Sequence, residues 1–274
     1  MRILELPVVE TEVPIRGSRR RWLIGVAAIT GAAAIALAAL YLTDGRVRGL
    51  LNSLLNRAAH RPPNEALIRW FSDPASREAL ATSFDAPCPG YPFLVPSSGL
   101  VGGLPWNAAY GPYNALNPHP GIDIFGQGSP GTVPVYAAYD GFLTREADWR
   151  SAVIIRHDDP LHPGETIWTY YTHMADLNGD HSYIVERFPP GTYDVPVRQG
   201  DLLGYQGLYN GGPSAPRIGL HVHFSIVRSD RSGHYRNEAV FGNTLDPTPY
   251  LGLSLNDPEG SQYPLRCLPP PDTS

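Results

Sequence analysis

Six short runs of apolar and β-branched residues lie in the second half of the chain, and they constrain its fold more than any other feature of the sequence. Each run is bounded by Gly, Pro, Asp or Asn, which is typical of β-strands joined by turns. No helical period separates the runs, so the sequence predicts a mainly β fold built on an antiparallel sheet. The 29 prolines, 28 glycines and 15 tyrosines fit such a turn-rich domain. The runs are residues 133–138, 141–146, 153–157, 167–173, 202–205 and 220–227.

A run of 21 apolar and small residues without charge, 22–42, follows three consecutive arginines at 19–21. A helix of that length rises about 30 Å, which is enough to cross the hydrocarbon core of a bilayer. The arginines predict a cytoplasmic N-terminus and an extracytoplasmic bulk, so we expect a single-pass protein of the cell membrane. Two alternatives stay open, namely a signal peptide cleaved near residues 36–38 and a twin-arginine export signal around residues 18–23.

The rest of the chain divides by its residue pattern. Leucines at three- and four-residue spacing after Val47 predict a short helical stalk, and recurring Pro and Gly in residues 86–106 predict a linker. The polar segments 158–165 and 178–194 predict long loops. The expected organisation is a cytoplasmic tail (1–21), a transmembrane helix (22–42), the stalk (43–85), the linker (86–112), a β-rich domain (113–251) and a C-terminal tail (252–274).

Charge and cysteine content limit the classes of partner. The net charge is -5 and no basic block occurs outside the N-terminus, which argues against a nucleic-acid partner. The two cysteines, Cys88 and Cys267, flank the β-rich domain. Outside the cytosol they could form a disulfide worth about 4–5 kcal/mol, and two unpaired thiols are the alternative. Neither lies near a histidine motif, so we expect neither to bind a metal.

The segment 219–227 carries two histidines on a predicted strand. Strand side chains alternate between two faces, so His221 and His223 share one face while Val222 and Phe224 lie on the other. Neighbouring imidazoles are a common way to hold zinc. An isolated His-x-His is nevertheless more often a pair of partly exposed histidines, so other motifs must decide between the two interpretations.

Two further motifs lie upstream of this pair. His119 and Asp123 occur in a Pro- and Gly-rich segment that we expect to be extended, and their spacing places them on the same side. His173 ends a predicted strand, where side chains reach into clefts. Catalytic zinc sites take three protein ligands, and His119, Asp123 and one histidine of the pair make such a set. Taken singly, each motif also fits an ordinary surface or packed histidine.

Taken in order, these motifs resemble the lysostaphin-like, or LytM-type, zinc metalloendopeptidases that act on peptidoglycan. The resemblance covers residues 113–251, about half of the chain. The segments that carry it are His119-Pro-Gly-Ile-Asp123, Thr132-Val-Pro-Val-Tyr-Ala-Ala-Tyr-Asp-Gly141, Val153-Ile-Ile-Arg-His157, Tyr171-Thr-His173-Met, Val197-Arg-Gln-Gly-Asp-Leu-Leu-Gly204, Leu220-His-Val-His-Phe224 and Asp246-Pro-Thr-Pro-Tyr-Leu251.

The resemblance implies a groove on the sheet with one Zn2+ on its floor, bound by His119, Asp123 and His223. It implies that His173 and His221 stay unligated and move protons, although the sequence does not say which of them is the general base. Tyr113 resembles a tyrosine that some members place near the oxyanion. The implied reaction is the hydrolysis of peptide bonds in peptidoglycan cross-links or stem peptides, outside the membrane.

One residue departs from the family pattern, since Ser225 stands where the family often has Glu after the His-x-His-Phe tetrad. A carboxylate that supports a zinc ligand is therefore missing or comes from elsewhere. A LytM-like module that binds or activates another wall hydrolase is the main alternative function. A zinc carboxypeptidase of the related His/Asp/His type is a third, but it would normally bring a Glu near its last histidine. The sequence does not predict an oligomeric state. The remaining histidines are expected to be surface or structural residues, namely His60, His157, His162, His181 and His234.

Overall fold

The computed structural model describes residues 91–109 and 113–253, the short strands β1 (Asp85–Ala86) and β12 (Leu265–Cys267), and a few separate positions. The chain divides into two units, Met1–Leu51 and Asn52–Ser274. The described residues of the first unit are all helical, namely Ala36, Ala39, Val47, Leu50 and Leu51. Most of the predicted membrane helix, stalk and C-terminal tail lies outside the described residues. Among the residues that are described, no helix has the length and hydropathy needed to cross a membrane.

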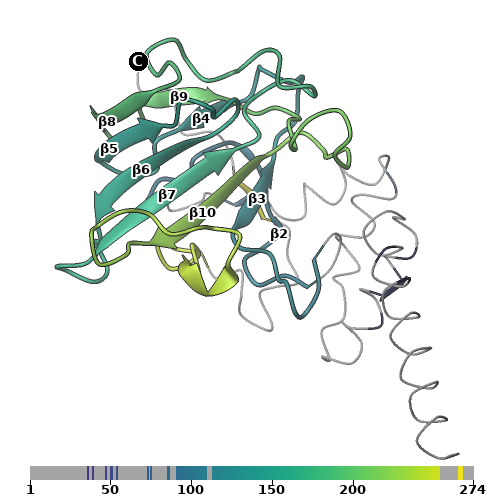
Figure 1. The fold of residues 1–274 in the computed structure, drawn as a ribbon, viewed down its shortest axis with the longest axis horizontal. Helices are drawn as coiled ribbons and strands as arrows, with labels where there is room; N and C mark the ends of the chain where they lie inside the picture. Colours follow the sequence, from purple (N-terminus) through teal and green to yellow (C-terminus); the bar gives the residue numbers. More distant parts are fainter. Residues whose placement is uncertain are drawn as a thin grey trace, which may run out of the picture. The chain divides into compact units, whose positions relative to one another are not determined.

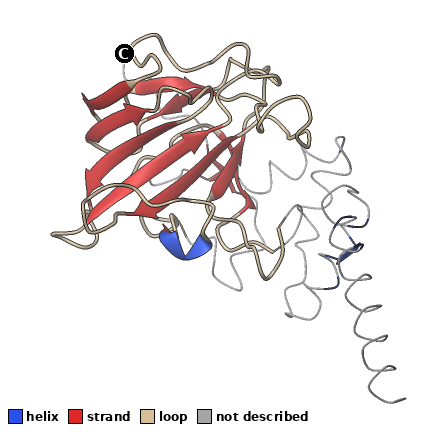
Figure 2. Cartoon of the chain, in the orientation of Figure 1, coloured by secondary structure: helices blue, strands red, loops and turns tan. Residues whose placement is uncertain are grey.

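The second unit is built on one large sheet, which confirms the predicted mainly β, antiparallel fold (Figures 1 and 2). The strand order is β1-β12-β2-β3-β10-β7-β6-β5-β8, β11 pairs with β10, and the pair β1-β12 alone is parallel among the described strands. The strands of this sheet not yet given bounds are β2 (Gly99–Leu104), β3 (Ile122–Phe125), β5 (Gly141–Arg145), β6 (Val153–Asp158), β7 (Thr166–Thr172), β8 (Thr192–Val197), β10 (Val222–Arg228) and β11 (Thr244–Leu245). A second sheet pairs β4 (Pro134–Tyr136) with β9 (Leu202–Tyr205). A 3-10 turn, η2 (Phe241–Asn243), precedes β11.

The main core lies between the two sheets. Phe224 on β10 and Tyr171 on β7 are fully buried there and belong to one cluster with Val135 of β4 and Leu203 of β9. Because strand side chains alternate, packing this face of β10 into the core turns His223 and its neighbours toward the opposite face. The hydrophobic pattern of β10 thus determines that the candidate site lies on the face of the sheet opposite the main core.

Two segments differ from what their composition predicts. Residues 178–194, expected as a loop, include the start of β8, an edge strand that carries Pro196 and is largely exposed. Proline is tolerated on an edge strand because the outer side needs no backbone donor. Residues 86–112, expected as a linker, contain β2 and the buried Phe93, so this segment contributes to the folded domain. The backbone of Cys267 pairs with that of Ala86, while Cys88 lies outside the described residues and the disulfide stays a prediction.

His157 on β6 is a structural histidine whose titration should be visible in the stability of the domain. It is 2% exposed, its Nδ1–H donates to the Asp140 carbonyl at 2.7 Å, and its Nε2 lies 2.7 Å from the Thr169 hydroxyl. Burial lowers the pKa of His157 to about 4. The unfolded chain binds this proton below pH about 6.5 and the folded chain does not, so stability falls as the pH drops toward 4.

We expect His157 to contribute a slope of about 1.4 kcal/mol per pH unit to the free energy of unfolding across this window. Urea unfolding of the wild type and of His157→Gln between pH 4.5 and 7.5 measures it. The variant is less stable throughout, but its stability should depend less steeply on pH. Equal slopes in the two proteins would contradict the prediction.

Candidate metal centre

Three adjacent strands bring the predicted site residues together. Asp123 on β3 is paired directly opposite His223 on β10. His221 lies just before β10, His173 follows the last residue of β7, and His119 lies in the loop before β3. The sequence alone does not give the register that places β3 beside β10, and this register brings the two motifs to one point.

Three atoms converge at the centre of the site. The Nε2 of His119 lies 3.0 Å from the Nδ1 of His223 and 3.2 Å from the Oδ1 of Asp123, and the last two atoms are 2.8 Å apart. All three residues are at most 5% exposed. They form a His/Asp/His group whose ligand atoms could hold one metal ion.

Hydrogen bonds at the far side of each imidazole determine which nitrogen faces the centre. The Nδ1 of His119 lies 3.1 Å from the carbonyl oxygen of Pro105, which can only accept, so this nitrogen carries the proton. The Nε2 of His223 donates to the Oε1 of Glu238 at 2.6 Å. Each ring therefore turns its other nitrogen, the Nε2 of His119 and the Nδ1 of His223, toward Asp123. Zinc-binding histidines are held by such outer partners.

The donor set fits zinc. Two imidazole lone pairs and a carboxylate oxygen are all acceptors, so they cannot satisfy one another without a cation among them. Tetrahedral zinc bonds of 2.0–2.1 Å separate the donor atoms by about 3.3 Å, close to the spacing found here. Burial raises the pKa of Asp123, but His119 and His221 outweigh it and hold that pKa well below its usual range. Burial also opposes a charged His223, yet Glu238 and Asp123 outweigh it and raise the pKa of this imidazole to about 10, so the two acids favour positive charge here.

His173 and His221 lie beside this group and are fixed in the same way. The Nδ1–H of His221 donates to the Gly219 carbonyl at 2.8 Å, and that of His173 donates to the Tyr209 carbonyl at 2.6 Å. Both rings therefore keep an Nε2 lone pair, and their centroids are 4.5 Å apart. Burial lowers the pKa of both imidazoles, that of His173 to about 3, so both are neutral at neutral pH.

His173 reaches its position through an unusual backbone conformation. Its φ is 73°, in the left-handed region that non-glycine residues rarely adopt. Such strain persists only where the surroundings impose it, and it is common at functional sites. The turn that it creates directs the imidazole back toward His221.

Tyr113 packs against the edge of the metal centre. Its ring centroid lies 4.6 Å from that of His119. Burial, followed by the charges of Asp123 and Glu238, raises its pKa well above the usual value, so the phenol stays protonated and can donate a hydrogen bond. The structure thus places the four site histidines and Asp123 near one another, with Tyr113 beside them.

Position 121, between His119 and Asp123, requires glycine. A Cβ at this position would lie 2.8 Å from the Nε2 of His223 and 2.5 Å from the carbonyl oxygen of Phe224. Any side chain here would therefore displace β10 or the ring that it carries. The His-Pro-Gly-Ile-Asp motif therefore contributes two candidate ligands and, through its glycine, lets the backbone pass close to β10.

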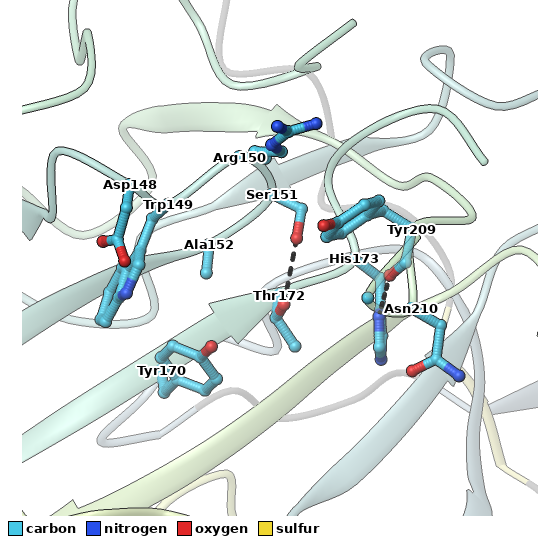
Figure 3. A pocket seen from close by; sticks show the side chains of 11 residues that line it. Asp148, Trp149, Arg150, Ser151, Ala152, Tyr170, Thr172, His173, Tyr209 and Asn210 are labelled. Atoms are coloured by element: carbon cyan, nitrogen blue, oxygen red, sulfur yellow. Dashed lines mark hydrogen bonds between the residues drawn. The ribbon is translucent and has the colours of Figure 1, made fainter. Parts of the chain in front are cut away.

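A cavity of about 370 Å³ opens beside His173 (Figure 3). It extends over Thr172 and Tyr170 of β7 to Trp149, and Tyr209 and Asn210 border it near His173. Aromatic side chains and backbone polar groups together can hold a peptide, so the space suits one side of an extended substrate.

The sequence does not point to Glu238, although its contact with His223 is among the shortest polar contacts of the site. Glu238 lies 15 positions after His223, in the loop between β10 and η2. No spacing rule links a strand histidine to a distant loop carboxylate, so only the folded chain shows the contact. The Oγ of Ser225, on the same face of β10 as His223, is buried without a hydrogen-bond partner within the described part of the chain.

Comparison with known proteins finds peptidases among solved structures. No protein-family model and no curated protein matches the chain. Similar solved structures are a protein named glycyl-glycine endopeptidase LytM from Ruminococcus gnavus (22% identity, TM-score 0.34, covering 57% of this chain and 52% of that one), lysostaphin from Staphylococcus simulans (23%, 0.33, 60% and 54%) and the catalytic domain of the M23 protein EnpA from Enterococcus faecalis (23%, 0.31, 60% and 98%). This chain spans about half the length of the first two. Likeness of this degree assigns no activity.

Proposed function

We propose that residues 113–251 form a zinc-dependent metalloendopeptidase that hydrolyses peptide bonds in peptidoglycan cross-links or stem peptides. The observation that carries the proposal is the convergence of two imidazole nitrogens and one carboxylate oxygen at a buried point, with the imidazoles of His173 and His221 beside them. The ordered sequence motifs support the substrate class. The predicted N-terminal membrane helix would hold the domain outside the cytoplasm, where that substrate lies.

His119, Asp123 and His223 would hold the zinc ion, through Nε2, Oδ1 and Nδ1 respectively. When bound, zinc supplies a Lewis acid that polarises a peptide carbonyl and lowers the pKa of a water molecule to about 7. His173 and His221 each offer a neutral Nε2 at this point, which can accept the proton of the attacking water and pass it to the leaving amine. Their Nδ1–H bonds to backbone carbonyls keep both rings oriented during the transfer.

Tyr113 and the cavity complete the proposed reaction site. The protonated phenol of Tyr113, whose ring packs against His119, would donate a hydrogen bond that stabilises the negative charge developing on the carbonyl oxygen. The cavity from His173 to Trp149 would bind the chain on one side of the scissile bond (Figure 3). Burial of the acids and imidazoles lowers the local dielectric, which strengthens each of these interactions.

The full-length protein, purified in mild detergent and supplied with zinc, is expected to release new amino groups and soluble muropeptides from purified peptidoglycan. A chelator should reduce the release to background, and added zinc should restore it. A protein that binds zinc and peptidoglycan without releasing any product would instead support the non-catalytic binding module. Free D-alanine as the sole product would support the carboxypeptidase alternative.

A further inference from the structure

We propose that Glu238 is the carboxylate that positions His223 for zinc, taking over a role that β10 itself does not fill. The inference rests on the proposed zinc site and concerns this chain's own residues. Glu238 is a positioning residue, because it would act through His223: its hydrogen bond is to the outer Nε2 of that ring and not to the Nδ1 that faces Asp123.

The contact has the geometry of an outer-shell partner. The Oε1 of Glu238 lies 2.6 Å from the Nε2 of His223, on the side of the ring opposite the Nδ1 that faces Asp123. The side chain of Glu238 is 19% exposed, so solvent competes little for this hydrogen bond. A carboxylate on the outer nitrogen fixes the ring orientation and makes the inner nitrogen a stronger donor to a metal. His223 is thus held between two acids, with Asp123 on the metal side.

With its own residues, β10 does not supply this partner. Ser225, two positions beyond His223 and on the same face, is too short to hydrogen-bond the ring, and its Oγ is buried without a partner within the described residues. The segment before β3 does not supply it either, because a Cβ at Gly121 would already lie 2.8 Å from the Nε2 of His223. The Nε2 of His223 is instead bonded by Glu238, which lies in the loop after β10.

Zinc affinity of the full-length protein, measured by competition with a chromophoric chelator and without substrate, tests the inference. Glu238→Ala is expected to bind zinc on the order of 10- to 100-fold more weakly than the wild type, and Glu238→Gln should be intermediate because its amide oxygen can still accept. Glu186→Gln removes an exposed acid far along the sequence and should leave the affinity unchanged. Thermal unfolding of the zinc-free proteins checks that each variant is folded.

A rescue variant separates the carboxylate from the packing of its loop. Glu238→Ala combined with Ser225→Glu puts a carboxylate on the face of β10 that carries His223, and should recover at least tenfold of the lost affinity. Wild-type zinc affinity in both Glu238→Ala and Glu238→Gln would overturn the inference and leave the proposed function standing. A wild type that binds zinc but hydrolyses no peptidoglycan would refute the proposed function and leave the role of Glu238 intact.

Discussion

Replacing His223 with alanine is expected to weaken zinc binding by a factor on the order of 1,000 and to abolish peptidoglycan hydrolysis. Zinc sites with binding energies of about 10–16 kcal/mol divide that energy among three or four ligands, so the loss of one ligand costs several kcal/mol. The change also leaves the carboxylates of Asp123 and Glu238 without the ring that lies between them. Zinc content after dialysis and release of amino groups from sacculi measure the two effects.

Two further variants make this result interpretable. His119→Ala removes the other imidazole ligand and should lose zinc to a similar extent, because its Nε2 lies 3.0 Å from the Nδ1 of His223. His181→Ala removes an exposed histidine and should keep both zinc and activity. A His223→Ala protein that retains one zinc per chain would show that the ion binds elsewhere and that the site assignment is wrong.

The antiparallel sheet could be predicted because most of its strands lie half in the core. In β10, the apolar Val222, Phe224 and Ile226 alternate with His223 and Ser225, and this alternation is visible in the sequence. The edge strand β8 could not be recognised in the same way. Its residues are mostly exposed and include Asp194 and Pro196, so its composition is that of a loop. Its place in the sheet depends on pairing with β5, which is a tertiary contact.

The candidate site, too, could be predicted from the sequence only in part. The shared face of His221 and His223 follows from strand geometry, and the spacing of His119 and Asp123 suggested one side, but only the register of β3 on β10 brings the two motifs together. The resemblance to a known family supplied that connection in advance. The groups that orient the imidazoles could not be found from sequence. Three of them are backbone carbonyls, which no residue type marks, and the fourth is Glu238.

His173→Asn is expected to separate metal binding from catalysis. Asparagine tolerates the left-handed φ of 73° better than alanine does, so the backbone turn after β7 should persist. His173 is not part of the group that could hold a metal, so zinc affinity should stay within about threefold of the wild type. Hydrolysis should fall by about 10²–10⁴-fold, because the variant loses a neutral imidazole that can accept and return the water proton. Turnover of a defined cross-linked peptide, measured alongside zinc content, checks both parts. Loss of zinc would make His173 a ligand, and full activity would leave proton transfer to His221 alone.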